Sequence, residues 1–125
     1  MKVRIYYHDT DCGGVVYYAN YLKYLEQGRT EFLEEKGVSI GGLAGEGVLF
    51  VVARQEIDYK APAHYGDTLE VATLLEDLSQ VKMVLACEIK NQDGKTICFA
   101  RTILVCVGKD LKPRVLPQDV RKALE

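Results

Sequence analysis

The sequence has few of the residues that carry metal or serine chemistry. Its two histidines, His8 and His64, stand apart from any paired cysteines or carboxylates at metal-ligand spacing. We therefore expect no metal site. Its two serines, Ser39 and Ser79, both lie outside a Gly-x-Ser-x-Gly motif. That absence excludes a hydrolase built on a nucleophile elbow.

The chain also lacks a charge excess and a long apolar run. Its 16 Lys and Arg oppose 18 Asp and Glu, which leaves a net charge of −2 and no electrostatic reason to expect nucleic acid or an anionic membrane as partner. The longest apolar run, Val48 to Ala53, is far shorter than the ~20 residues of a membrane-spanning helix. Met1 to Ile5 shows no signal-peptide core. We expect a cytoplasmic protein.

Size and cysteine usage fit one domain in a reducing compartment. A chain of 125 residues buries roughly two-thirds of its unfolded surface without disulfides, so we expect a single domain over residues 1–125. The cysteines show no Cys-x-x-Cys spacing, and three of the four lie in apolar, strand-like runs: Cys12, Cys87, Cys98 and Cys106. We interpret them as reduced thiols.

Hydrophobic periodicity predicts an α+β fold with one long helix and an antiparallel meander. A glycine-bearing polar segment separates the first strand from the helix, and Asn91 to Gly94 reads as a hairpin turn. The expected strands are 2–7, 48–59, 67–76, 81–90 and 96–107, and the expected helices are 15–36 and 118–124.

The long helix is expected to bury one face against the sheet. Gly28 in its middle indicates close packing on the sheet, and Gly37 is a plausible left-handed C-cap. The loop around 41–47 is expected to be a mobile connection, since it lacks the Gly-Lys-Ser/Thr ending of a phosphate loop. The apolar stripe comprises Tyr18, Tyr21, Leu22, Leu25, Phe32 and Leu33.

A second apolar face on the sheet indicates self-association. One helix covers one face only, so apolar side chains on the other face need a further cover. We therefore predict a homo-oligomer. The residues assigned to that second face are Val84, Ala86, Cys98, Leu104 and Cys106.

The densest chemical cluster runs from Tyr6 to Tyr21. It places Asp11 and two glycines just before the expected helix start. Unpaired N–H groups and the helix dipole at such a place stabilise a carboxylate or a developing oxyanion. Asp11 is thus a candidate catalytic carboxylate, with backbone amides near Tyr17 and Tyr18 polarising a carbonyl. An ordinary Asp N-cap explains the same pattern.

The segment from Tyr6 to Tyr17 resembles the signature Tyr-x-x-Asp-Thr-Asp-x-x-Gly-x-Val-Tyr of hotdog-fold thioesterases. It is similar to the 4-hydroxybenzoyl-CoA thioesterase branch, and above all to the bacterial Tol–Pal-associated acyl-CoA thioesterases. Further resemblance lies in Tyr59 to Ala63, Gly66 to Val71 and Lys112 to Pro117. The resemblance implies a five-stranded sheet wrapped around the helix. It also implies homodimers, assembled into homotetramers, with active sites at the dimer interface.

By that resemblance Asp11 is the catalytic carboxylate and the Tyr18 backbone N–H binds the thioester carbonyl. The Tol–Pal-associated members usually carry His where this chain has Tyr18, so an imidazole role in proton transfer is lost there unless His8 or His64 supplies it. Both histidines are otherwise ordinary surface or loop residues, and the sequence places neither near Asp11. The implied activity is hydrolysis of a small acyl or aryl thioester of CoA, or of acyl carrier protein, without a cofactor. Asp11 either attacks the carbonyl or takes a proton from water.

Several other residues are candidates for substrate binding. Thr10 and Asn20 either orient Asp11 or cap the backbone locally. Tyr7 and Tyr17 are candidates for an acyl or aryl pocket. Arg54, Lys60 and Lys82 are candidates for the CoA phosphates, with solvated surface charge as the ordinary alternative.

Two other functions fit the same fold. A dehydratase or hydratase acting on acyl thioesters would pair a histidine with a carboxylate, and no histidine stands at the expected helix start. A non-catalytic acyl-CoA-binding domain would ordinarily carry an appended DNA-binding segment, for which 125 residues leave no room.

Overall fold

The computed structural model describes all 125 residues and has the predicted α+β architecture. The alternating apolar and polar residues of four segments form long strands, and a period of three to four residues forms the central helix. The elements are β1 (Lys2–Arg4), the short 3-10 turn η1 (Tyr7–Asp9), α1 (Asn20–Glu35), α2 (Ile40–Gly45), β2 (Leu49–Tyr59), β3 (Thr68–Leu78), β4 (Lys82–Lys90), β5 (Thr96–Val107) and α3 (Gln118–Leu124).

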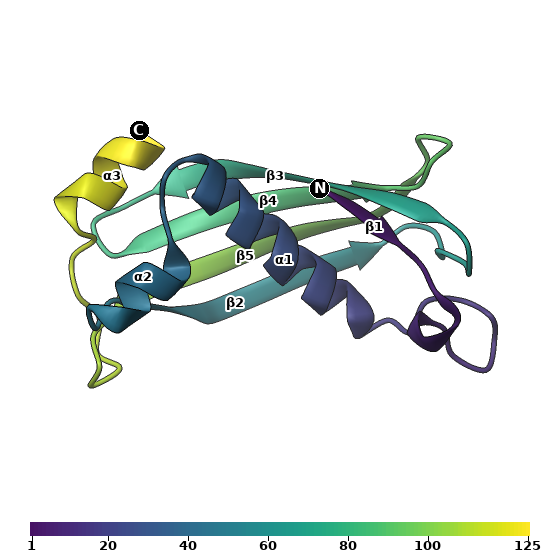
Figure 1. Ribbon diagram of the computed structural model, residues 1–125, viewed down its shortest axis with the longest axis horizontal. Coiled ribbons are helices and arrows are strands. Elements are labelled where there is room, and N and C mark those ends of the chain that lie inside the picture. The colour runs from purple at the N-terminus through teal and green to yellow at the C-terminus, as the bar shows by residue number, and fades with distance from the viewer.

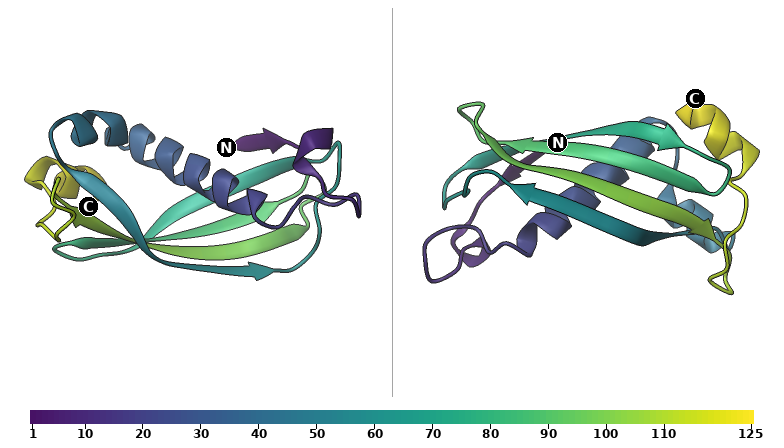
Figure 2. Two further views of the ribbon diagram at one scale, coloured as in Figure 1. Left: turned by 90° about the horizontal axis from the view of Figure 1, so that it is seen from below. Right: turned by 180° about the vertical axis from the view of Figure 1, so that it is seen from behind.

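The five strands form one antiparallel sheet in the order β1-β3-β4-β5-β2. Helix α1 runs diagonally across one face of this sheet (Figure 1). Seen from the side, the sheet curves around α1, and no helix lies on its opposite face (Figure 2). Below, that opposite face is called the bare face. No helix of the chain is long and apolar enough to cross a membrane.

The core between α1 and the sheet consists of two apolar clusters. The first, of 12 buried residues, surrounds Tyr21 and Leu25 in the N-terminal half of α1. The second, of 10 buried residues, surrounds Leu33 and includes Leu43 of α2 and Val120 of α3. The first cluster also contains Val16, which precedes α1, and Ala63, which lies between β2 and β3, so it attaches both connections to the core.

Two glycines of the helix region behave as the sequence predicts. A Cβ built on Gly28 would lie 2.7 Å from Val71 Cγ1 and 3.1 Å from Thr73 Oγ1, which confirms the close packing on β3. Gly37 has φ +85° directly after the C-cap Lys36, in the left-handed conformation expected for a helix end.

Three element boundaries differ from the prediction. The first strand ends at Arg4, and the chain then enters η1. Helix α1 begins at Asn20, several residues later than expected, with Ala19 as an N-cap that contributes no side-chain hydrogen bond. The connection at 41–47 contains α2, which begins after Ser39, whose Oγ accepts the Gly42 N–H at 3.1 Å.

The predicted second apolar face is wrong for three of its five residues. Cys98, Leu104 and Cys106 are buried toward α1. Cross-strand pairing explains this, because Leu104 is opposite Met83 and therefore points to the same side of the sheet. The bare face instead carries Leu74, Val84, Ala86 and Phe99.

All four cysteines are free thiols, as the sequence predicts. Cys98 and Cys106 are buried, Cys87 is half-buried and Cys12 is exposed. Burial raises the pKa of the Cys98 thiol to about 12, which keeps it protonated near neutral pH.

We expect Gly28→Ala to destabilise the fold. The added methyl group would press on Val71, and such overpacking costs about 1–3 kcal/mol, more than the ~1 kcal/mol that alanine gains over glycine in a helix. Urea unfolding measures the change. The matched control is Gly41→Ala in α2, where an added Cβ has no atom within 4 Å. Equal effects of the two substitutions would contradict close packing at Gly28.

Candidate active site

The segment Thr10 to Val16, called here the Asp11 loop, folds back on itself. Thr10 and Val16 form an antiparallel bridge, and the Asp11 N–H donates to the Val15 carbonyl at 2.9 Å. The Gly14 N–H donates to the Asp11 carbonyl at 3.1 Å, and Gly14 has φ +80°, which favours glycine. The Asp11 loop is therefore a tight hairpin that precedes α1.

The Asp11 loop is attached to the connection between β2 and β3. The Val16 N–H donates to the Ala63 carbonyl at 2.8 Å, and Val15 forms a bridge with His64. Ala63 is fully buried and Val16 nearly so. These contacts fix a glycine-rich loop to the core without a helix or long strand of its own.

Asp11 lies at the exposed side of this loop. Its Oδ1 accepts the Gly13 N–H at 2.8 Å, and its Oδ2 receives no hydrogen bond from the chain. The predicted placement at the start of a helix is wrong, because α1 begins nine residues later. Val15 and Val16 pair with the connection between β2 and β3, so their backbone is extended and cannot form the first turn of α1.

The Tyr18 backbone N–H donates to no group of the chain. It lies one residue before the N-cap Ala19, outside the first turn of α1. Its neighbours are fixed, because the Tyr17 N–H donates to the Asp9 carbonyl at 3.0 Å and the Asn20 N–H to the Tyr17 carbonyl at 2.9 Å. A free donor on a fixed backbone is suited to an oxyanion.

Asp9 is a structural centre that the sequence prediction missed. Its Oδ2 accepts the Tyr6 N–H at 2.8 Å, and its carbonyl accepts the Asn20 side-chain amide at 2.9 Å. The Asn20 amide is thus used to tie α1 to η1. The Thr10 hydroxyl donates to the Tyr7 carbonyl at 2.7 Å, as a local cap. The signal for Asp9 was the Tyr-x-x-Asp spacing, which is typical of a side-chain cap.

Five tyrosines form a continuous chain of ring contacts from the surface to the core. Successive ring centroids lie 5.0, 6.4, 5.6 and 5.9 Å apart, and only the last two rings are buried. In order, the tyrosine chain is Tyr17, Tyr18, Tyr59, Tyr21 and Tyr24. The Tyr59 hydroxyl also donates to the Tyr18 carbonyl at 3.1 Å. Tyr7 lies outside the chain and packs edge-on against Tyr65.

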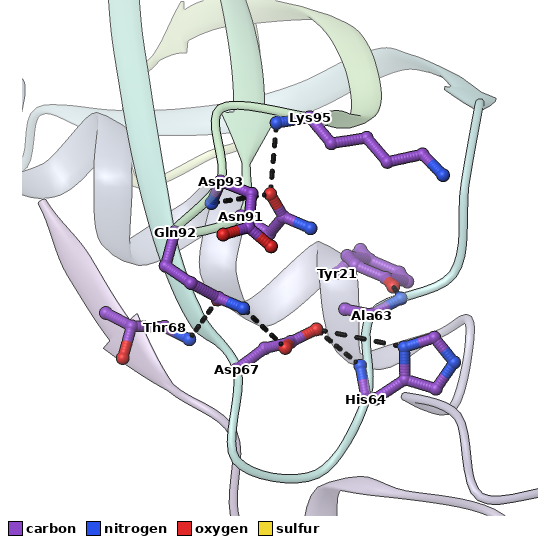
Figure 3. Close-up of polar contacts among 9 residues, drawn as sticks. All are labelled: Tyr21, Ala63, His64, Asp67, Thr68, Asn91, Gln92, Asp93 and Lys95. Carbon is purple, nitrogen blue, oxygen red and sulfur yellow. Dashed lines mark hydrogen bonds and ion pairs between the residues drawn. The ribbon is translucent and has the colours of Figure 1, made fainter.

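The two buried tyrosines differ in how their hydroxyls are satisfied. The Tyr21 hydroxyl accepts the Ala63 N–H at 3.3 Å (Figure 3), and burial raises the pKa of Tyr21 to about 12. The Tyr24 hydroxyl is buried without a hydrogen-bond partner. Burial and the nearby Asp9 carboxylate raise the pKa of Tyr24. Tyr21 therefore supports the connection that holds the Asp11 loop.

The structure does not gather the three predicted CoA-binding cations. Arg54 lies on β2 and pairs with Glu56 at 2.5 Å. Lys60 follows the far end of β2, about 20 Å along the strand from Arg54 at ~3.3 Å per residue. Lys82 is the first residue of β4. It precedes Met83, which is buried toward α1, so the Lys82 side chain points to the bare face. Arg54 and Lys60 of one chain therefore do not form a single cluster of cations.

A hollow of about 440 Å³ lies on the bare face, and none of the predicted site residues lines it. Its lining includes Leu74, Phe99 and Arg101, and the Arg101 guanidinium donates to the Glu76 carboxylate.

No three His, Cys, Asp or Glu side chains lie close enough together to hold a metal ion. Residues 11–14 of the Asp11 loop are exposed in the single chain.

Comparison with known proteins identifies the family. The sequence pattern of the thioesterase-like superfamily matches residues 5–124. The chain belongs to this superfamily, and it is an enzyme of the thioester hydrolase class. The acyl-CoA thioester hydrolase YbgC of Escherichia coli is 39% identical over 119 residues, which cover 94% of this chain and 89% of that protein.

Solved structures of thioesterases have the same fold. The DHNA-CoA thioesterase of Staphylococcus aureus superposes with a TM-score of 0.94 at 28% identity, covering 98% of this chain and 85% of that one. A 1,4-dihydroxy-2-naphthoyl-CoA thioesterase from Synechocystis superposes with a TM-score of 0.91 at 27% identity, covering 99% and 93%. The predicted hotdog fold is confirmed.

We expect Tyr21→Phe to destabilise the protein and Tyr24→Phe to leave stability unchanged or raised. Tyr21→Phe leaves the buried Ala63 N–H without an acceptor, at a cost of about 1–3 kcal/mol, whereas the Tyr24 hydroxyl has no bond to lose. Urea unfolding of both variants provides the measurement. A larger loss in Tyr24→Phe than in Tyr21→Phe would show that this assignment of the hydroxyls is wrong.

Proposed function

We propose that the protein hydrolyses acyl-CoA thioesters with the Asp11 carboxylate and the Tyr18 backbone N–H. The proposal rests on one observation: the same short segment presents a carboxylate with an unpaired Oδ2 and a backbone N–H without an acceptor. The name of the E. coli relative, an acyl-CoA thioester hydrolase, supports CoA as the carrier. Acyl carrier protein is the alternative carrier.

The two groups supply complementary parts of the reaction. Asp11 either attacks the thioester carbon or takes a proton from the attacking water, and both routes need the ionised carboxylate. The carbonyl oxygen becomes negative in the transition state, and the Tyr18 N–H donates to it. The thiolate of CoA leaves readily near neutral pH, so the reaction needs little help at the sulfur atom.

The tyrosine chain favours an aryl or short acyl group as substrate. Tyr17, Tyr18 and Tyr59 are about half exposed beside the free Tyr18 N–H and offer ring faces and edges to a planar group. The two solved relatives named above act, by their names, on an aromatic CoA thioester. This agreement supports an aromatic acyl group for the present protein.

A second copy of the chain completes the site in our proposal. No residue of the Asp11 loop lines the hollow on the bare face, and the outer edge of β2 is unpaired over 11 residues. An edge of that length is a ready surface for pairing. A homodimer, assembled into a homotetramer through the bare face, would bring cations such as Arg54 or Lys60 of a second copy to the CoA phosphates.

We expect Asp11→Asn to lower kcat for CoA release by at least about 100-fold, because loss of a general base or nucleophile has effects of about 10²–10⁴. A thiol reagent that detects free CoA measures the rate. The substitution keeps the shape of the side chain and its exposed position, so the free energy of unfolding should change by less than about 0.5 kcal/mol.

The matched control for this experiment is Asp110→Asn in the turn after β5. Asp110 is exposed, and its Oδ1 accepts the Lys112 N–H at 3.0 Å as Asp11 Oδ1 accepts the Gly13 N–H, so this variant should retain the wild-type rate. Near-normal turnover by Asp11→Asn would refute the proposed role of Asp11.

We expect Tyr17→Leu to lower kcat/KM for benzoyl-CoA about 2–10-fold more than for butanoyl-CoA. An aromatic pair contributes about 0.5–1.5 kcal/mol beyond its buried area, and only the aryl substrate can form one. Tyr6→Leu is the control, because Tyr6 is equally exposed but stacks on His8 outside the tyrosine chain. Parallel losses for both substrates would exclude a selective contact between Tyr17 and an aryl group.

A further inference from the structure

The bridges of the Asp11 loop align three residues from three neighbouring segments. Because Thr10 is opposite Val16, Asp11 is opposite Val15, as the 2.9 Å bond from the Asp11 N–H to the Val15 carbonyl shows. Val15 is in turn opposite His64. Asp11, Val15 and His64 therefore form one row across the paired segments 10–11, 15–16 and 63–64.

This row faces away from the core. Cross-strand partners point to the same side of a sheet, and successive residues point to opposite sides. The adjacent row contains Val16 and Ala63, which are 4% and 0% exposed and belong to the core. Asp11 and His64 are both exposed, as the alternation requires. Their side chains thus share the outer surface.

The spacing of the row fits a reacting group between carboxylate and imidazole. Neighbouring strands lie about 5 Å apart, which puts the Asp11 and His64 Cα atoms about 10 Å from each other. Each side chain extends a few ångströms from its backbone, and Val15 forms the floor between them. A thioester carbonyl and one water molecule would have to bind between the two side chains, which do not contact each other.

The Asp67 carboxylate binds the His64 backbone and lies beside its ring. Asp67 Oδ2 accepts the His64 backbone N–H at 2.9 Å and lies 3.9 Å from His64 Nδ1 (Figure 3). Asp67 Oδ1 accepts the Gln92 amide at 3.0 Å, and Gln92 Oε1 accepts the Thr68 N–H at 3.0 Å. The Asp67 side chain is 15% exposed and that of His64 is 58% exposed. The Asp67 carboxylate thus binds the His64 backbone and lies on the Nδ1 side of the ring, which leaves Nε2 on the other side.

We propose that His64 Nε2 takes the proton of the hydrolytic water at Asp11. This inference rests on the proposed function. An Asp11 oxygen bonds to the thioester carbon, the C–S bond breaks, and the thiolate leaves with the electron pair. Water then adds to the acyl carbon and gives one proton to His64 Nε2. The bond to Asp11 breaks, which restores the carboxylate, and the imidazolium returns its proton to the thiolate to give acid and thiol.

The proposed role of His64 requires an uncharged imidazole. Histidine is the side chain that changes charge between pH 5 and 8, and only its neutral form accepts a proton. No cation forms an ion pair with His64. The charged and titratable groups of the surrounding segments are Asp67 on its own connection, Asp11 and Cys12 on the Asp11 loop, Tyr65 beside it, and Asp93 and Lys95 on the adjoining turn.

The test is His64→Gln, assayed for CoA release over pH 5–8. We expect kcat to fall by about 100-fold with KM changed less than threefold, since general bases contribute about 10²–10⁴. The wild-type kcat should decline from pH 8 to pH 5, and the variant should lose that decline. Asp67→Asn should give a smaller loss in kcat, again without a change in KM.

Two further measurements separate chemistry from folding. His8→Gln is the matched control, because His8 is exposed, stacks on Tyr6 and should keep the wild-type rate and pH profile. In His64→Ala, added imidazole should restore part of kcat, which a structural role would not allow. A His64→Gln enzyme within twofold of wild type, with its pH profile intact, overturns the proposal.

The outcome is distinguishable from failure of the proposed function. If Asp11→Asn is inactive while His64→Gln is normal, the role of Asp11 stands and that of His64 falls. If the wild-type protein releases no CoA from any acyl-CoA tested, both fall together.

Discussion

The hydrogen bond from the Val16 N–H to the Ala63 carbonyl joins the two segments on which the candidate site depends. Neither segment has regular structure of sufficient length to hold itself in place. Ala63 is fully buried and its N–H is bound by Tyr21 of α1, so the connection is fixed to the helix on one side and to the Asp11 loop on the other. The exposed position of Asp11 follows from this arrangement.

The sheet and helix supply the rigid support behind that contact. Gly28 allows α1 to lie close to β3, and Tyr21 and Leu25 of the same helix pack into the first core cluster. The candidate site consists of loop residues on this rigid support, as binding and catalytic sites of enzymes commonly do. The tyrosine chain crosses from one part to the other, because Tyr21 and Tyr24 are core residues while Tyr17 and Tyr18 are surface residues.

Most of the fold could be predicted from the sequence, because its long elements have clear periods. The strands β3 to β5, the turn at Asn91 to Gly94 and the end of α1 at Gly37 follow from alternation and from glycine. The start of α1 could not be predicted in the same way. Residues 15–18 satisfy helical spacing as well, and their pairing with residues 9–11 and with the distant Ala63 and His64 decides in favour of an extended backbone at 15–16. In β5, the side of the sheet to which Cys98 and Leu104 point depends on their pairing with Ile89 and Met83 of β4. The sequence of β5 alone does not determine that pairing.

The candidate site was predictable only in part. Asp11 and the Tyr18 N–H come from one contiguous motif, whereas His64 is aligned with Asp11 only through the bridge to Val15, across about 50 residues of chain. The Gln92 side chain extends this dependence to a third segment, since it links Asp67 to the backbone at Thr68. The hairpin tip thereby fixes the carboxylate that binds the His64 backbone. No residue of this tip belongs to either core cluster, so the position of His64 depends on a surface turn that contributes nothing to the apolar core.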